Sequence, residues 1–98
     1  MPRFTPHITV ATIVEKEGRF LFVKEHAEER IVLNQPAGHL EMDESLIQAA
    51  IRETLEETGW DIEITDLIGI YLYKAPANNV TYQRVCFAGR AVAQRENH

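Results

Sequence analysis

Three glutamates near the middle of the chain have a spacing that could hold a metal ion. Glu53, Glu56 and Glu57 stand at positions i, i+3 and i+4, which places their carboxylates along one edge of a helix. Like charges at this spacing destabilise a helix, and its dipole disfavours anions near the C-terminus. Carboxylate oxygens are hard ligands that suit Mg²⁺, Mn²⁺ or Ca²⁺. We therefore expect a divalent cation here, and a solvated acidic helix face is the alternative.

The residues around these glutamates predict the helix that positions them. Ser45 suits the N-cap, and Gln48 completes a capping-box pattern. Gly59 suits the left-handed position after a helix, so the helix should end at about Thr58. A mostly apolar stripe at helical spacing should dock against a sheet. The stripe comprises Leu46, Ile47, Ala50, Ile51, Thr54 and Leu55.

Residues 38–60 resemble the signature of the Nudix hydrolases. The seven fixed positions of that signature all match, and many fixed positions in one continuous segment make the resemblance specific. The matching residues are Gly38, Glu44, Arg52, Glu53, Glu56, Glu57 and Gly59. Thr54 departs mildly from the first aliphatic position, and Trp60 fills the second. The stretches HITVA at 7–11 and NQPAGHLE at 34–41 look like the NudJ branch of this family.

The resemblance implies an α/β fold in which a mixed sheet lies between helices, an α/β/α sandwich. It also implies a metal-dependent hydrolase of phosphoanhydride bonds in nucleoside di- or triphosphates, or in related organic diphosphates such as thiamin-type pyrophosphates. Water would attack phosphorus with the help of Mg²⁺, for which Mn²⁺ could substitute. A nucleotide-sensing binding module with the same fold, without catalysis, is the alternative. A structural domain whose acidic helix is merely solvated is a third possibility.

The resemblance further implies roles for individual residues. The implied metal ligands are Glu53, Glu56, Glu57 and the backbone carbonyl of Gly38. Glu53 would join the metal cluster or act as the base. Arg52 would orient the acidic residues through Glu44 or Glu56 rather than touch the substrate.

Four further residues are candidates for binding a small phosphorylated substrate. Arg84 could clamp a phosphate, and Tyr73 could stack on an aromatic ring. Gln35 could present its amide, and His39 could line the pocket. Ordinary packing or hydrogen bonding is the competing explanation for each of them.

Composition excludes several classes of protein. A formal net charge of −5 argues against general nucleic-acid binding. No apolar run approaches membrane-spanning length, and a single cysteine excludes an intramolecular disulfide. We expect a cytoplasmic protein whose 98 residues form one domain, residues 1–98.

The remaining segments read mainly as strands. We expect a hairpin of strands 5–15 and 19–24, followed by a charged loop or helical turn at 25–30 and a short strand at 31–33. After the helix, extended segments at 60–64 and 67–74 should flank a bend, and strand 80–93 should pair with 67–74 as a second hairpin.

One helix can cover only one face of such a sheet. Uncovered apolar residues would be Ile8, Val10, Phe22 and Val85 on one side, or their neighbours on the other. We therefore expect either a C-terminally incomplete domain, lacking a strand and helix, or a homodimer that buries the open face.

Overall fold

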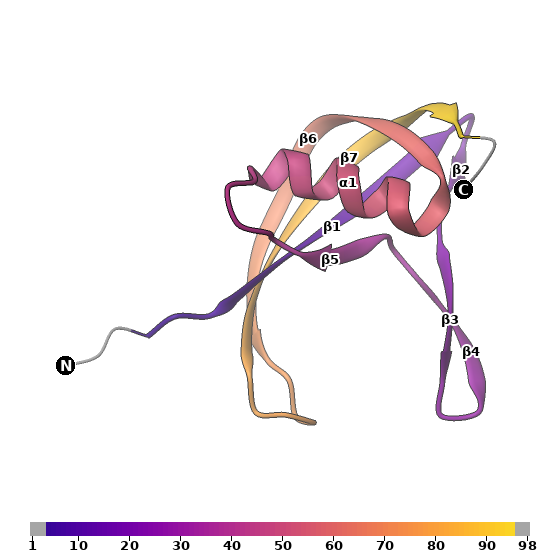
Figure 1. The fold of residues 1–98 in the computed structure, drawn as a ribbon. Coiled ribbons are helices and arrows are strands. Elements are labelled where there is room, and N and C mark those ends of the chain that lie inside the picture. The colour runs from indigo at the N-terminus through magenta and orange to yellow at the C-terminus, as the bar shows by residue number, and fades with distance from the viewer. Residues whose placement is uncertain (1–3, 96–98) are drawn as a thin grey trace.

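The computed structural model describes residues 4–95, which form seven strands and one helix (Figure 1). The strands are β1 (His7–Lys16), β2 (Arg19–Phe20), β3 (Val23–Ala27), β4 (Arg30–Asn34), β5 (Ala37–His39), β6 (Trp60–Lys74) and β7 (Thr81–Gln94), and the helix is α1 (Leu46–Thr58). This described helix is too short and too polar to cross a membrane.

Five of the strands form one mixed sheet with α1 lying across it. Its order is β2-β1-β7-β6, and β5 also pairs with β1. The central pair, β1 and β7, is parallel, whereas β6 runs antiparallel to β7. Strands β3 and β4 form a separate hairpin that projects from the sheet (Figure 1). The predicted α/β fold with a mixed sheet is confirmed.

The ends of α1 are as predicted. The Ser45 hydroxyl accepts a hydrogen bond from the Gln48 amide (3.0 Å), and the Gln48 side chain accepts one from the Ser45 amide (2.8 Å). Gly59 has φ +77° and its amide donates to the carbonyl of Leu55. Short-range hydrogen bonds therefore set both ends of the helix.

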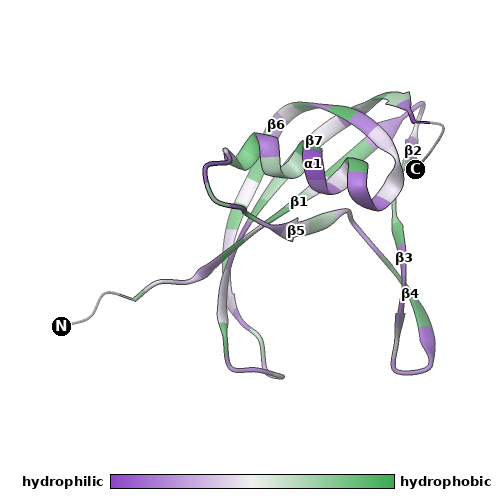
Figure 2. Ribbon diagram, in the orientation of Figure 1, coloured by the Kyte–Doolittle hydropathy of each residue, from purple (hydrophilic) through white to green (hydrophobic). Residues whose placement is uncertain are grey.

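The core lies where α1 meets the middle of the sheet. It joins Ala49 and Ala50 of the helix to Val10, Val85 and Phe87 of the central strands. Small alanine side chains let the helix backbone approach the sheet closely. In Figure 2, hydrophobic and hydrophilic residues alternate along α1, as in a helix with one face against a sheet.

One prediction about this core is wrong, and one of two alternatives is excluded. Ile47, predicted in the apolar stripe, is half exposed, and Ala49 is buried instead. The docking face still includes Ala50 and Thr54 of the predicted stripe, so it is only slightly rotated from the prediction. Val10 and Val85, which one of the two alternatives placed on the uncovered face, lie beneath α1 and are buried. Ile8 and Phe22 remain partly exposed, and more open apolar surface lies along β6.

Residues 25–30, predicted as a charged loop or helical turn, instead complete the β3–β4 hairpin. Glu28 and Glu29 form its turn with φ +48° and +65°, as a tight hairpin turn requires. The predicted strand 19–24 is split between β2 and β3 because β5 occupies the same edge of β1 at Thr9–Ala11.

The two predicted hairpins, β1–β2 and β6–β7, are present. The prediction of two separate extended segments around a bend at 64–67 is wrong, because β6 is a single strand of 15 residues. Three register shifts absorb the irregularity, the last between Leu67 and Gly69. Bulges of this kind bend a strand while keeping it in its sheet.

Candidate active site

The acidic edge of α1 lies along the outer edge of β5. Thr12 donates its amide to the carbonyl of Pro36 (3.0 Å), and Leu40 donates to Ile8 (3.2 Å). Hydrogen-bonding direction alternates along an antiparallel strand, so Gly38, midway between these positions, points its amide and carbonyl towards β1. The backbone groups of Ala37 and His39 therefore point outwards, towards the helix.

Two hydrogen bonds from β5 to the helix agree with this orientation. The Ala37 amide donates to Oε1 of Glu57 (2.8 Å), and Nη2 of Arg52 donates to the carbonyl of His39 (2.9 Å). The helix and the edge strand are thus held together through two residues of the motif.

Gly38 is required by the position of Glu53. A Cβ atom added at Gly38 would lie 2.1 Å from the Cδ atom of Glu53. The glycine therefore leaves the space that this carboxylate occupies. Its carbonyl, implied by the resemblance as a metal ligand, faces β1 instead, whereas the Ala37 carbonyl faces the outer edge.

Arg52 is the centre of the charged network. Its Nε and Nη2 atoms donate to the two carboxylate oxygens of Glu44 (2.7 and 3.1 Å). Its Nη1 atom donates to Glu53 (2.6 Å) and to Glu56 (3.2 Å), and lies 3.4 Å from an oxygen of Glu41. The predicted contacts of Arg52 with Glu44 and Glu56 are confirmed.

These contacts shift the pKa values of both main partners. The hydrogen bonds from Arg52 hold the pKa of Glu44 below its ordinary value, against a smaller opposing effect of burial. The Glu44 carboxylate raises the pKa of Arg52, and Glu53 adds to this rise. Both groups therefore stay ionised at neutral pH.

Glu57 is in a different environment. Burial raises the pKa of its carboxyl group, and the negative charges of Glu53, Glu25 and Glu56 add to this rise. The Ala37 amide opposes it by stabilising the ionised form. Glu25 comes from β3, and no local sequence signal could have placed it here, since the long-range position of the hairpin decides it.

The chemistry of these residues fits a hard divalent cation. Three carboxylates, those of Glu44, Glu53 and Glu56, bind a single guanidinium. Glu57 is held separately by the Ala37 amide, and Gly38 keeps space open beside Glu53. Within residues 4–95 no group of three acidic, histidine or cysteine side chains is arranged to hold a metal ion. Glu53 and Glu56 are instead turned towards Arg52, which takes up the charge that a cation would neutralise.

The sheet face opposite α1 carries an aromatic group that we call the ring cluster: His7, His39, Tyr73 and Tyr82. The Tyr82 ring stacks with Tyr73 at 5.5 Å and lies 5.8 Å from His7 and 6.3 Å from His39. Asn78 donates to the Tyr82 hydroxyl (3.1 Å). Because His39 also belongs to β5, the cluster begins next to the acidic site.

Three of the four predicted substrate residues lie on the same face of the sheet. His39 and Tyr73 belong to the ring cluster, and Arg84, two residues beyond Tyr82 on β7, faces the same side of the sheet. Gln35 is half buried just before β5, and no described contact joins it to the others. Tyr82, at the centre of the cluster, is not among the four predicted residues.

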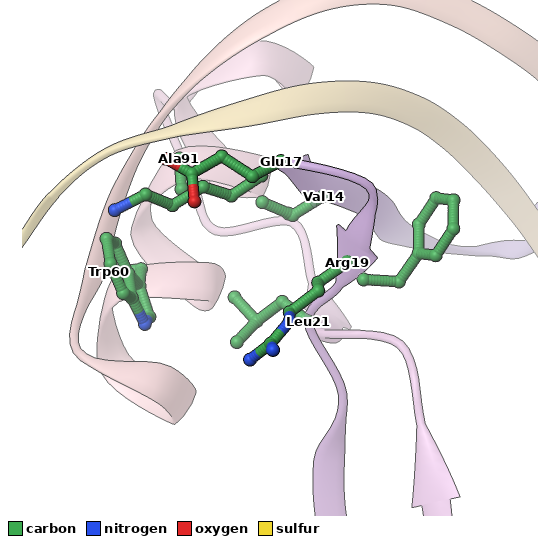
Figure 3. A pocket seen from close by; sticks show the side chains of 8 residues that line it. Val14, Glu17, Arg19, Leu21, Trp60 and Ala91 are labelled. Atoms are coloured by element: carbon green, nitrogen blue, oxygen red, sulfur yellow. The ribbon is translucent and has the colours of Figure 1, made fainter.

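A hollow of about 570 Å³ lies elsewhere, lined by Val14, Arg19, Leu21 and Trp60 among others (Figure 3). Lys16 places its Nζ atom 4.6 Å from the centre of the Trp60 ring. None of the motif glutamates lines this hollow. The acidic site is therefore identified by its chemistry rather than by the depth of the surface.

Comparison with known proteins identifies the family of this chain. The NUDIX domain pattern matches residues 3–97. The chain belongs to the Nudix family. Phosphatase NudJ of Escherichia coli (strain K12) is 45% identical over 85 residues, which cover 87% of this chain and 55% of that protein.

Solved structures of other Nudix proteins show the same fold. A NUDIX hydrolase from Nitrosomonas europaea has 44% identity and a TM-score of 0.87, over 95% of this chain and 64% of the other. A second structure from that organism has 30% identity and a TM-score of 0.76, over 94% and 51%. The chain thus spans about half the length of the curated relatives it matches.

Proposed function

We propose that this chain is a metal-dependent hydrolase of phosphoanhydride bonds, acting on a nucleoside di- or triphosphate or a related organic diphosphate. One observation carries the proposal. Arg52 gathers Glu44, Glu53 and Glu56, while Glu57 is anchored to the Ala37 amide on the adjoining edge strand. A solvated acidic helix face would not require these hydrogen bonds to Arg52 and to the edge strand.

Glu53, Glu56 and Glu57 are the proposed ligands of a divalent cation, with Mg²⁺ as the natural ion and Mn²⁺ as a substitute. When bound, such an ion neutralises phosphate oxygens and lowers the pKa of a water molecule. The outward carbonyl of Ala37 is the backbone oxygen that can join them. Gly38 contributes clearance for Glu53.

Arg52 is proposed as a positioning residue. Its five N–H donors form a rigid fork, and each end of that fork already holds a motif carboxylate. Arg52 would keep its two hydrogen bonds to Glu44 if Glu53 and Glu56 turned away to hold a cation. Glu44 thus fixes the arginine, and the arginine limits how far the other acids can move.

We propose that the organic part of the substrate extends from the acidic site over the ring cluster. His39 and Tyr73 would contact a flat ring by stacking or edge contacts. Arg84, on the same face, would bind a phosphate oxygen, and Gln35 would contact the substrate from the segment before β5. The net charge of −5 repels a free polyphosphate, so the substrate should bind together with its cation.

The proposal is tested with a panel of nucleoside di- and triphosphates and organic pyrophosphates in the presence of Mg²⁺. Orthophosphate and pyrophosphate are measured separately, which identifies the bond that breaks. E53Q, E56Q and E57Q should each lose activity by orders of magnitude. E63Q is the matched control, because Glu63 pairs with Arg90 on exposed surface.

Calorimetric titration with Mg²⁺ separates the parts of the proposal. Mg²⁺ binding without phosphate release from any compound would support the metal site and contradict the proposed reaction. Activity that persists in EDTA, or that survives in all three glutamine variants, would contradict the mechanism itself.

A further inference from the structure

The hollow of about 570 Å³ beyond the C-terminal end of α1 is separate from the acidic site. Its volume is in the range of pockets that bind small molecules. Its apolar lining combines Val14 of β1, Ala91 of β7 and Trp60 of β6 with Leu21, which follows β2. Val14 is buried and the other three are partly buried. The hollow can therefore hold a flat apolar group.

Two cationic side chains line the same hollow. Lys16 and Arg19 are directly opposite partners in the β1–β2 hairpin, so their Cβ atoms lie about 4.5–5.5 Å apart. Like charges placed opposite each other destabilise a hairpin. Neither side chain forms an ion pair with any other residue between 4 and 95. Glu17 adds one negative charge to the lining, so positive charge remains in excess.

The positive charge lies next to the aromatic side of the hollow. The Nζ atom of Lys16 is 4.6 Å from the centre of the Trp60 ring, a cation–π contact that favours this position of the ammonium group. In Figure 3, Trp60 and Arg19 lie on different sides of the hollow, and Leu21 lies between them. An anionic group held by Lys16 and Arg19 would bring an attached ring against Trp60 and Leu21.

We propose that this hollow is a second ligand site, which binds a small organic anion with a flat aromatic body. The anionic group is a carboxylate or a phosphate monoester. Lys16 and Arg19 bind it through charge-assisted hydrogen bonds, and the anion removes the repulsion between them. Trp60 and Leu21 contact the ring of the ligand. None of the motif glutamates takes part, because none of them lines the hollow.

Trp60 provides a direct measurement of binding. It is the only tryptophan of the chain, so its indole N–H gives a single side-chain cross-peak in the ¹⁵N–¹H spectrum of the labelled protein. The probes are indole-3-acetate, a carboxylate, and phenyl phosphate, a phosphate monoester. At least one of them should shift this peak in a saturable way with a Kd of about 1 mM or lower.

Two control compounds separate the charge of the ligand from its ring. Indole-3-acetamide has nearly the same shape as indole-3-acetate without the charge, and inorganic phosphate has the charge without a ring. Each should bind at least about tenfold more weakly than the matching probe.

Two variants test the cationic side chains. K16M and R19M each remove one cation and keep an apolar side chain, and each should weaken binding by at least about tenfold. K24M, which changes an exposed lysine of β3 outside the hollow, should bind as the wild type does.

Saturable binding of either probe with these controls supports the proposal, and the tighter probe identifies the anionic group. The absence of a saturable shift up to about 10 mM of both probes overturns it. An affinity that is unchanged in K16M or in R19M overturns it as well, because the cations then do not hold the ligand. Binding of indole-3-acetamide or inorganic phosphate as tight as that of the matching probe has the same consequence.

Discussion

Replacing Gly38 by alanine should separate function from stability at the acidic site. The new Cβ would lie 2.1 Å from Cδ of Glu53, whereas ordinary contacts begin near 3.4 Å. The carboxylate must therefore retreat by more than about 1 Å, a displacement that can cost about 100-fold in rate when it affects a catalytic group. The atoms that the new Cβ meets are the flexible end of the Glu53 side chain, so the fold itself should lose only about 1 kcal/mol, the low end of the range for added methylene groups.

Three measurements on G38A test this reasoning. We expect a melting temperature within about 4–8 °C of the wild-type value. Calorimetry should show Mg²⁺ binding weakened by at least about tenfold, and phosphate release should fall by about 100-fold. The hydrogen bond between Glu53 and Arg52, now 2.6 Å, should also be lost.

Gly18 supplies the matched control. It lies in the β1–β2 turn with φ +78°, and an added Cβ would meet no atom within 4 Å. G18A should therefore cost about 1–2 kcal/mol of stability through backbone strain while leaving metal binding and activity unchanged. The two alanine variants thus have opposite expected effects. Full Mg²⁺ affinity and activity in G38A would refute the role assigned to the space beside Glu53.

Three further predictions follow from the charges of the site. E57Q should raise the melting temperature of the metal-free chain at neutral pH. Burial and acidic neighbours raise the pKa of Glu57, so its ionised form destabilises the fold. An unchanged or lower melting temperature would contradict this. The stability that Glu44 adds should be present at neutral pH and lost as the pH falls below about 4.5, since Arg52 lowers its pKa; melting curves of wild type and E44Q should converge in acid. Mg²⁺ at about 100 times its dissociation constant should stabilise the fold by about 2.7 kcal/mol, EDTA should reverse this, and a melting temperature insensitive to both would exclude the metal site.

The residues whose partners lie close in sequence were predictable. Ser45 and Gln48 bond each other across one helical turn, and Gly59 ends the same helix, so α1 was predicted correctly at both ends. The contacts of Arg52 with Glu56 and Glu44 also lie within this segment. Helical geometry brings such neighbours together whatever the rest of the chain does. The motif glutamates were therefore found from their spacing, and their roles as metal ligands remain predictions.

Long-range pairing decided the features that sequence reasoning missed. Strand β5 takes part of the edge of β1, so residues 19–24 could not continue as one strand, and residues 25–30 became half of a hairpin. That register turns the Gly38 carbonyl inwards and the backbone of Ala37 towards Glu57. Extended segments of similar composition fit many registers equally well. Only the completed sheet selects one of them, because only there are the backbone hydrogen bonds of β1, β5 and β7 satisfied together.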